Sequence, residues 1–251
     1  MKKRVRNDLP ALIFVFLLLF LWQFGAMKAD AAYIIPTPVQ ILQRLWELRE
    51  PLFTAHLPAT MLCTGIGLAI SIVLGVLLAV LMDAFPLAEK ALYPIIIASQ
   101  TIPTTALAPL FVLWFGYSIW SRVLVTVLIT FFPITISVFD GFRSVPADMT
   151  DLLRTFGADQ RTVFRKLKLP AVLPHFFSAV KMAVPLSIIG AAIGEWLGAQ
   201  SGLGYFSRRM MTQLDGPGVF APIVLLSAVA MLLVGVVSLL EKRLLRWRGE
   251  S

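Results

Sequence analysis

Residues 57–82 read LPATMLCTGIGLAISIVLGVLLAVLM and contain no charged side chain. A helix needs about 20 apolar residues to cross a hydrocarbon core about 30 Å thick. This stretch is long enough to do so, and it predicts a transmembrane helix at residues 59–82.

Five further apolar runs accompany this stretch and predict an all-α, polytopic membrane protein. The first run exceeds the apolar segment of about 7–15 residues found in secretory signals, and no small-residue cleavage motif follows it closely, so we interpret it as a retained span. A single domain over residues 1–251 is therefore expected, with a cytoplasmic loop at about 141–170 between spans four and five. The six expected spans are 9–27, 59–82, 91–115, 122–140, 174–196 and 219–240.

The composition agrees with a membrane protein. Hydrophobic residues make up 58% of the chain and charged residues 14%, and the mean hydropathy is +0.84. Soluble domains carry roughly a quarter charged residues. The net charge of +8 comes from basic residues between apolar segments rather than on one face, which argues against nucleic acid as a partner. The single cysteine, Cys63, excludes a disulfide within the chain.

The positions of lysine and arginine predict the orientation. With the N-terminus inside, 15 of these residues fall in cytoplasmic segments and 6 in outer segments. Cytoplasmic loops carry the excess of such residues. Both termini are therefore expected in the cytoplasm, and the inner membrane of a bacterial cell is the expected location.

Prolines and polar residues within the spans indicate that the helices do more than anchor the chain. A proline removes a backbone hydrogen bond that lipid cannot replace, so the helix around Pro103 must pack on protein or line a wet cavity. We interpret six residues as candidates for a translocation path: Gln100, Thr101, Pro103, Thr104, Glu195 and Trp196. Hydrogen bonds between helices would explain the polar residues around Pro103 equally well. Glu195 could instead be solvated, and Trp196 could belong to the aromatic belt at the membrane interface.

The cytoplasmic stretch at 151–170 reads DLLRTFGADQRTVFRKLKLP. Apolar residues at helical spacing before and after Gly157 predict two short helices hinged at this glycine. Asp159 is placed to cap the second helix, and Pro170 to end or kink it. Taken alone, so basic an amphipathic segment is typical of a helix that lies on a membrane surface.

The same stretch resembles the "EAA" coupling loop of bacterial ABC importer permeases. The usual pattern there is Glu-Ala-Ala, a glycine after three more residues, and a terminal Leu-Pro. This chain departs from the pattern by placing an aspartate and two leucines at the Glu-Ala-Ala positions. The residues that carry the resemblance are Asp151, Leu152, Leu153, Gly157, Ala158, Phe164, Leu169 and Pro170.

Further motifs resemble the branch of that family that transports nitrate, sulfonate, taurine and pyrimidines. They are IPTP at 35–38, TIP at 101–103, APL at 108–110, LWFG at 113–116, GA at 198–199 and SGLGY at 201–205. EWLG at 195–198 together with RRMM at 208–211 looks most like permeases for pyrimidine precursors of thiamine. The resemblance therefore implies a small polar solute, with a sulfonate, taurine or nitrate as the competing substrates.

The resemblance also implies partners. The loop would dock on a separate ABC ATPase, present in two copies, and a second permease copy would complete a homodimer around the path. An extracytoplasmic solute-binding protein would deliver the solute. ATP and Mg²⁺ would bind to the ATPase, because this chain has no phosphate-binding Gly-x-x-x-x-Gly-Lys-Ser/Thr loop and no cofactor is expected in it.

Two other classes of protein were weighed. A stand-alone ion-coupled secondary transporter predicts acidic residues in mid-span and repeated halves, and the sequence has neither. A membrane-embedded enzyme predicts a nucleophile with its base or paired carboxylates, and no catalytic residues of this kind are placed together. His56 and His175 have no neighbouring ligands at metal-binding spacing, so no metal site is expected.

Overall fold

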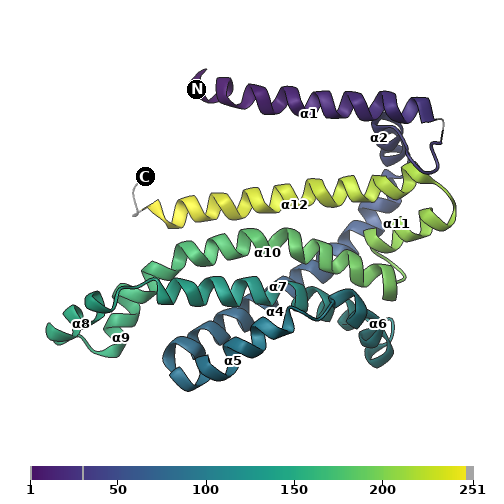
Figure 1. The fold of residues 1–251 in the computed structure, drawn as a ribbon. Coiled ribbons are helices and arrows are strands. Elements are labelled where there is room, and N and C mark those ends of the chain that lie inside the picture. Colours follow the sequence, from purple (N-terminus) through teal and green to yellow (C-terminus); the bar gives the residue numbers. More distant parts are fainter. Residues whose placement is uncertain (1, 30, 247–251) are drawn as a thin grey trace.

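The computed structural model describes residues 2–29 and 31–246, with side chains described from Pro10 onward except at positions 11 and 12. Arg248, counted above among the cytoplasmic basic residues, lies outside this part. The described residues form helices and short connections without a β-strand (Figure 1). The helices are α1 Lys2–Ala29, α2 Pro38–Glu47, α3 Arg49–Pro51, η1 Leu52–His56, α4 Leu57–Ala84, α5 Pro86–Ser99, α6 Thr104–Phe115, α7 Ile119–Arg143, α8 Ala147–Thr155, α9 Gln160–Val163, η2 Phe164–Lys168, α10 Leu169–Gly198, α11 Leu203–Thr212 and α12 Gly216–Leu244.

Four helical segments of the described part are long and apolar enough to cross a membrane by themselves. They are Arg49–Ala84, Ile119–Arg143, Gln160–Gly198 and Gly216–Leu244. A shorter apolar helix, Ile13–Ala29, overlaps most of the first expected span at 9–27.

Residues 91–115 were predicted as one span, but they belong to two helices, α5 and α6, which are bent by 95° relative to each other. Pro103 precedes α6 with extended backbone at φ −63° and ψ 113°. Proline has no N–H to continue the hydrogen-bond ladder of α5. The chain therefore turns at residues 100–103 instead of continuing straight.

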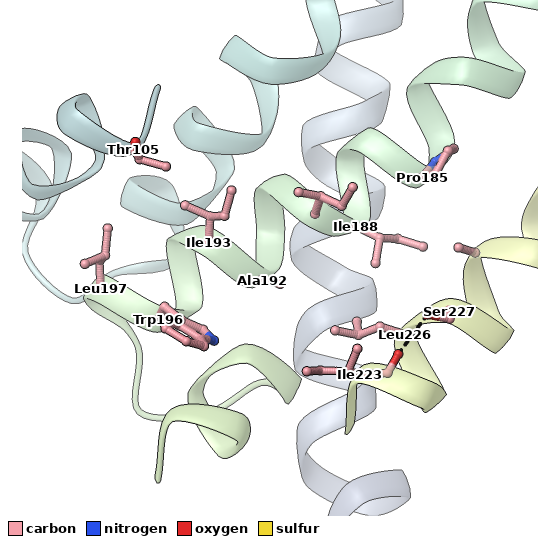
Figure 2. Close-up of a pocket in the computed structure, with 12 residues that line it drawn as sticks. Thr105, Pro185, Ile188, Ala192, Ile193, Trp196, Leu197, Ile223, Leu226 and Ser227 are labelled. Carbon is pink, nitrogen blue, oxygen red and sulfur yellow. Dashed lines mark hydrogen bonds between the residues drawn. The ribbon is translucent and has the colours of Figure 1, made fainter. Parts of the chain in front are cut away.

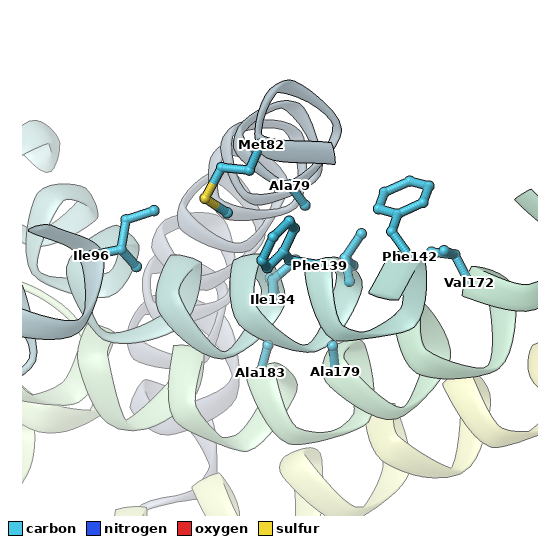
Figure 3. Close-up of a cluster of buried hydrophobic side chains, with 10 residues drawn as sticks. Ala79, Met82, Ile96, Ile134, Phe139, Phe142, Val172, Ala179 and Ala183 are labelled. Atoms are coloured by element: carbon cyan, nitrogen blue, oxygen red, sulfur yellow. The ribbon is translucent and has the colours of Figure 1, made fainter. Parts of the chain in front are cut away.

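The core of the molecule is the packing of α4, α7 and α10. Small residues let these helices approach closely: a Cβ on Gly75 of α4 would overlap Ile134 of α7, and one on Gly190 of α10 would overlap the backbone of Thr126. Figure 3 shows the largest buried cluster, in which side chains of all three helices and Ile96 of α5 meet. Its members are Ala79, Met82, Ile96, Ile134, Val138, Phe139, Phe142, Val172, Ala179 and Ala183.

Two π-helical turns, η1 and η2, interrupt the long helices, and each one directly precedes a Leu-Pro pair. The amide of Leu57 donates to the carbonyl of Leu52, and the amide of Leu169 donates to the carbonyl of Phe164. A proline ring clashes with the carbonyl four residues earlier in a regular α-helix, and the wider turn removes this clash. Pro170 was expected to end or kink its helix. Instead the helix continues through the proline as α10.

The elements gather at two ends of the bundle (Figure 1). Helices α8 and α9 lie at one end, together with the start of α1 and the finish of α12. Helices α2 and α11 lie at the opposite end, where Asp215 both caps α12 and accepts two hydrogen bonds from Arg44 of α2, at 2.9 and 2.7 Å. The sequence predicted only connections at α2 and α11.

Candidate functional site

The first candidate region is the loop between α7 and α10, and its local structure agrees with the two predicted helices. Helix α8 ends in a Schellman motif, in which the amides of Gly157 and Ala158 donate to the carbonyls of Arg154 and Leu153 at 2.8 and 3.0 Å. The motif needs a residue with positive φ after the helix. Gly157 has φ +80°, which glycine adopts without the strain of a side chain.

Asp159 caps α9, as the sequence predicted. Its side chain accepts a hydrogen bond from the amide of Thr162 at 3.0 Å. Hydrogen bonds from the side chain and the amide of Thr162 hold the pKa of the Asp159 carboxyl below its usual value, because they stabilise the charged form.

The loop residues singled out by sequence fall into two groups. Leu152 and its neighbour Phe156 are exposed at 57% and 80% on the outer face of α8, and Asp151 beside them lies 3.8 Å from Arg154. Phe164 instead points inward and stacks on Phe142 of α7, with ring centroids 5.9 Å apart. Leu152 and Phe156 form an exposed apolar tip, and Phe164 anchors the loop to the bundle.

The remaining loop residues lie where one helical segment ends and the next begins. Leu153 and Ala158 are half-buried at the end of α8, where they complete the Schellman motif. Leu169 and Pro170 form the first turn of α10, immediately after η2.

The second candidate region is the break between α5 and α6, which opens into a pocket of about 400 Å³. Residues from the middle of α7 and α10 wall the pocket, so it lies at the central depth of the bundle. The lining residues are Ser99, Gln100, Ile102, Pro103, Thr104, Leu107, Leu128, Ile129, Phe131, Pro133 and Leu186.

The structure brings three of the predicted path residues together at this pocket. Gln100, Pro103 and Thr104 all line it. Thr101 does not, because its hydroxyl donates back to the carbonyl of Ala98 at 2.7 Å.

Glu195 lies elsewhere, at the end of the bundle that holds α11, and its side chain is enclosed by protein with 0% exposure. One oxygen, Oε2, accepts from the hydroxyl of Thr60 at 3.0 Å and from the amide of Gly204 at 2.8 Å. The other, Oε1, is buried without a hydrogen-bond partner, as is Nε of Arg122. The carboxyl therefore ties α10 to α4 and to α11.

The N-terminus of α11 is held by side chains from two other helical segments. The amides of Gly202, Leu203 and Gly204 donate to His56 Nδ1 at 3.2 Å, Thr60 Oγ1 at 2.8 Å and Glu195 Oε2 at 2.8 Å. The first amides of a helix have no partner within it, so these three side chains satisfy them. Gly202 has φ +118°, and a Cβ there would overlap the Glu195 carboxyl.

Trp196 lines a separate cavity of about 740 Å³ between α10 and α12 (Figure 2). The lining side chains are apolar except for the hydroxyls of Thr105 and Ser227 and the indole N–H of Trp196. The carbonyl of Trp196 accepts a hydrogen bond from Arg208 of α11. The path residues predicted from sequence thus lie at three separate places.

Comparison with known proteins identifies the family. Residues 71–246 match the family described as "Binding-protein-dependent transport system inner membrane component". This range includes the loop 141–170, the broken helix pair and Glu195. The chain belongs to this family.

Relatives at the level of the whole chain agree with this assignment. The chain is 52% identical over 249 residues to the formylaminopyrimidine transport permease protein ThiX of Halalkalibacterium halodurans, which covers 99% of this chain and 100% of the relative. It is 33% identical to the riboflavin transport system permease protein RibX of Chloroflexus aurantiacus, covering 97% and 93%. It is 32% identical to the putative aliphatic sulfonates transport permease protein SsuC of Bacillus subtilis, covering 96% and 86%.

The fold has a solved counterpart. An inward-facing structure of the MetNI methionine ABC transporter superposes with a TM-score of 0.64 at 19% identity, covering 82% of this chain and 97% of the matched chain. This likeness supports the all-α polytopic fold. The protein is a multi-pass membrane permease of an ABC importer, and it works with a separate ATPase and a solute-binding protein.

Two ion pairs of the permease were not predicted from sequence. Lys168 pairs with Asp83 of α4, and Lys181 pairs with Glu241 of α12 at 2.7 Å. The only signal in the sequence was an opposite charge near the end of another span.

In the described part of the chain, no three His, Cys, Asp or Glu side chains are grouped so as to hold a metal ion.

Proposed function

We propose that this permease imports a small neutral aminopyrimidine of the formylaminopyrimidine class, a precursor of the thiamine pyrimidine. The observation that carries the proposal is the 52% identity, over the full length of both chains, to a permease named for that solute. Permeases named for riboflavin and for sulfonates are less similar, at 33% and 32% identity.

The chemistry of the pocket at the α5–α6 break supports a neutral solute. Among its described lining residues none is charged, and the polar groups are those of Ser99, Gln100 and Thr104. A sulfonate or nitrate ion would call for cationic or multiple N–H donors. An amide and hydroxyls match the donors and acceptors of an aminopyrimidine, and Phe131 offers an aromatic face for its ring.

We further propose that two copies of the permease enclose the path. In the single chain, Gln100, Thr101 and Pro103 at the break are exposed. Irregular backbone at membrane depth is stable only when protein covers it or when it lines a wet cavity. A second copy facing the break would provide this cover and leave Gln100 and Thr104 on a shared path.

The proposed topology has six spans, with the α5–α6 pair as the third, and both termini in the cytoplasm. The lysine and arginine distribution supports this orientation. So does the position of α8 and α9 at the same end of the bundle as the start of α1 and the finish of α12 (Figure 1). A reporter fused after Ser251 should be active only in its cytoplasmic form, and an exported readout would refute the orientation.

The loop 141–170 is the proposed docking element for the ATPase, two copies of which would serve the dimer. The exposed apolar tip formed by Leu152 and Phe156 supports this role, because water-exposed apolar side chains favour a partner surface. ATP and Mg²⁺ would bind only to the ATPase, and the permease would carry out no covalent chemistry and need no cofactor.

Reconstitution into liposomes with the cognate ATPase and binding protein tests the proposal. ATP-dependent uptake of a labelled formylaminopyrimidine is expected, with little competition from excess taurine or nitrate. Uptake of one of these competitors in place of the pyrimidine would refute the substrate. Accumulation by the permease alone, driven by an ion gradient, would instead establish a stand-alone secondary transporter.

A further inference from the structure

An ion pair joins the base of the loop that carries α8 and α9 to the end of α4. Nζ of Lys168 lies 2.7 Å from Oδ1 and 2.8 Å from Oδ2 of Asp83. The two side chains are mostly covered, with 25% and 15% of their surface exposed. A partly buried pair that engages both carboxylate oxygens is stronger than an exposed surface pair.

Both residues occupy joints of the fold. Lys168 is the last residue of the π-helical turn η2, directly before α10. Asp83 is the penultimate residue of α4, and only Phe85 separates α4 from α5, which begins at Pro86. The pair therefore connects the base of the loop to the corner between α4 and α5.

The corner leads directly to the pocket at the helix break. Helix α5 runs from Pro86 at the corner to Ser99, which lines the pocket together with Gln100. It packs on the core through Ile96, and Tyr93 contacts Phe139 of α7, with ring centroids 5.8 Å apart. A shift of the corner would therefore move α5 and change the mouth of the pocket.

The loop would bend at η2 if nothing else held it. A π-helical turn is a local defect in the α-helical ladder, and Pro170 contributes no N–H just beyond it. A cavity of about 350 Å³, lined by residues of α4, α8 and α9, leaves room for α8 to move toward the corner. The stacking of Phe164 on Phe142 fixes the loop to α7.

We propose that Asp83 and Lys168 are a positioning pair that transmits movement of the loop to the α4–α5 corner and from there to the pocket. The inference rests on the proposed role of the loop as the ATPase docking element. Without the pair, η2 yields, and the movement of the loop reaches α5 only indirectly, through α7 and its Tyr93–Phe139 and Arg143–Glu89 contacts. ATP would then be hydrolysed without efficient opening of the pocket at Gln100.

The test uses the permease reconstituted with its ATPase and binding protein. The single variants Asp83→Asn and Lys168→Met remove one charge each, and the exchange variant D83K/K168D restores an ion pair with reversed polarity. A matched control exists in the Lys181–Glu241 pair, which has the same 2.7 Å length and similar exposure, at 30% and 21%, but joins α10 to α12. The measured quantity is solute taken up per ATP hydrolysed.

Both single variants should co-purify with the ATPase and hydrolyse ATP, while uptake per ATP falls roughly fivefold or more. The exchange variant should recover at least about half of the lost ratio. Lys181→Met and Glu241→Gln should stay within roughly twofold of the parent. A second readout is thiol labelling of Gln100→Cys, because the native Cys63 is buried: ATP should change the labelling rate in the parent and not in K168M.

An unchanged ratio in D83N and K168M, with an intact ATP response at position 100, would overturn the inference while leaving the proposed function in place. A loss of ATPase binding in the single variants and in D83K/K168D would also overturn it, since the pair would then belong to the docking surface. Failure of the parent permease to show ATP-driven uptake would instead reject the proposed function.

Discussion

Removal of the Glu195 carboxyl should loosen α11 from the bundle, and the structure gives the size of the effect. In Glu195→Ala the amide of Gly204 loses its acceptor in a buried site, which costs about 1–3 kcal/mol. The hydroxyl of Thr60 can turn to the carbonyl of His56, at 3.2 Å, and loses less. The space left by the missing side chain adds about 1 kcal/mol. The expected loss of stability is about 2–4 kcal/mol.

The variant Glu195→Gln separates the hydrogen bonds from the bulk of the side chain. Its amide oxygen can accept from both Thr60 and Gly204, so the loss should be only about 1 kcal/mol. The difference of roughly 2 kcal/mol between the two variants should appear as about 4–8 °C in the melting temperature of the detergent-purified permease.

A double-mutant cycle makes the test sharper. Thr60→Val removes the other member of the network and also leaves the amide of Leu203 without its acceptor. Because the two side chains share a hydrogen bond, the losses in E195A and T60V should not add. Thr54→Val is the matched control, since its exposed hydroxyl bonds only within its own helix segment, to the Glu50 carbonyl. Equal melting temperatures for E195A and E195Q would refute the role assigned to the carboxyl.

Four further predictions concern the backbone and the loop. Gly202→Ala should destabilise the permease by more than about 2 kcal/mol, because alanine at φ +118° is strained and its Cβ overlaps Glu195; thermal melting measures this. Gly157→Val places a β-branched residue at φ +80°, which costs about 1–2 kcal/mol, and it should lower uptake; normal uptake would contradict this role of the glycine. Asp151→Lys should reduce co-purification with the ATPase, and full retention of the complex would contradict the docking role. The folded-state pKa of Asp159 lies below its usual value of 3.8. The charged cap therefore stabilises α9 fully above that pH, and this stabilisation is lost as the pH falls through the folded-state pKa. Hydrogen exchange of the α9 amides should become faster over the same pH range, and Asp159→Asn should weaken this pH dependence.

Hydropathy and charge predicted much of the fold because lipid imposes a simple length rule. Long apolar runs located the helices α4, α7, α10 and α12, and apolar residues at helical spacing around Gly157 located the two helices of the loop. The 95° bend between α5 and α6 could not be read in the same way. Residues 91–115 carry no charged side chain that would mark the break, and the angle depends on how α5 packs against α4 and α6 packs against α7.

The role of Glu195 shows a different limit of sequence reasoning. A carboxylate at the end of an apolar run can face water, a solute or the protein interior, and its hydropathy is the same in each case. Its partners decide among these, and Thr60 is 135 positions away in the chain. The glycines of SGLGY were visible in the sequence. Only the structure shows why glycine is needed there: α11 approaches Glu195 and the backbone of Ala192 too closely for a side chain.

The π-helical turns η1 and η2 have a consequence for chain length among related permeases. Each turn holds one residue more than an α-helical turn, and that residue belongs to no regular repeat. Deleting one residue from either turn would replace the wide turn by an α-helical one and bring back the clash with the proline ring, and the adjoining segment would rotate by about 100° relative to the span. Homologues shortened by one residue before either Leu-Pro pair should therefore present a different face of α2 or α9, while the packing of their spans remains the same.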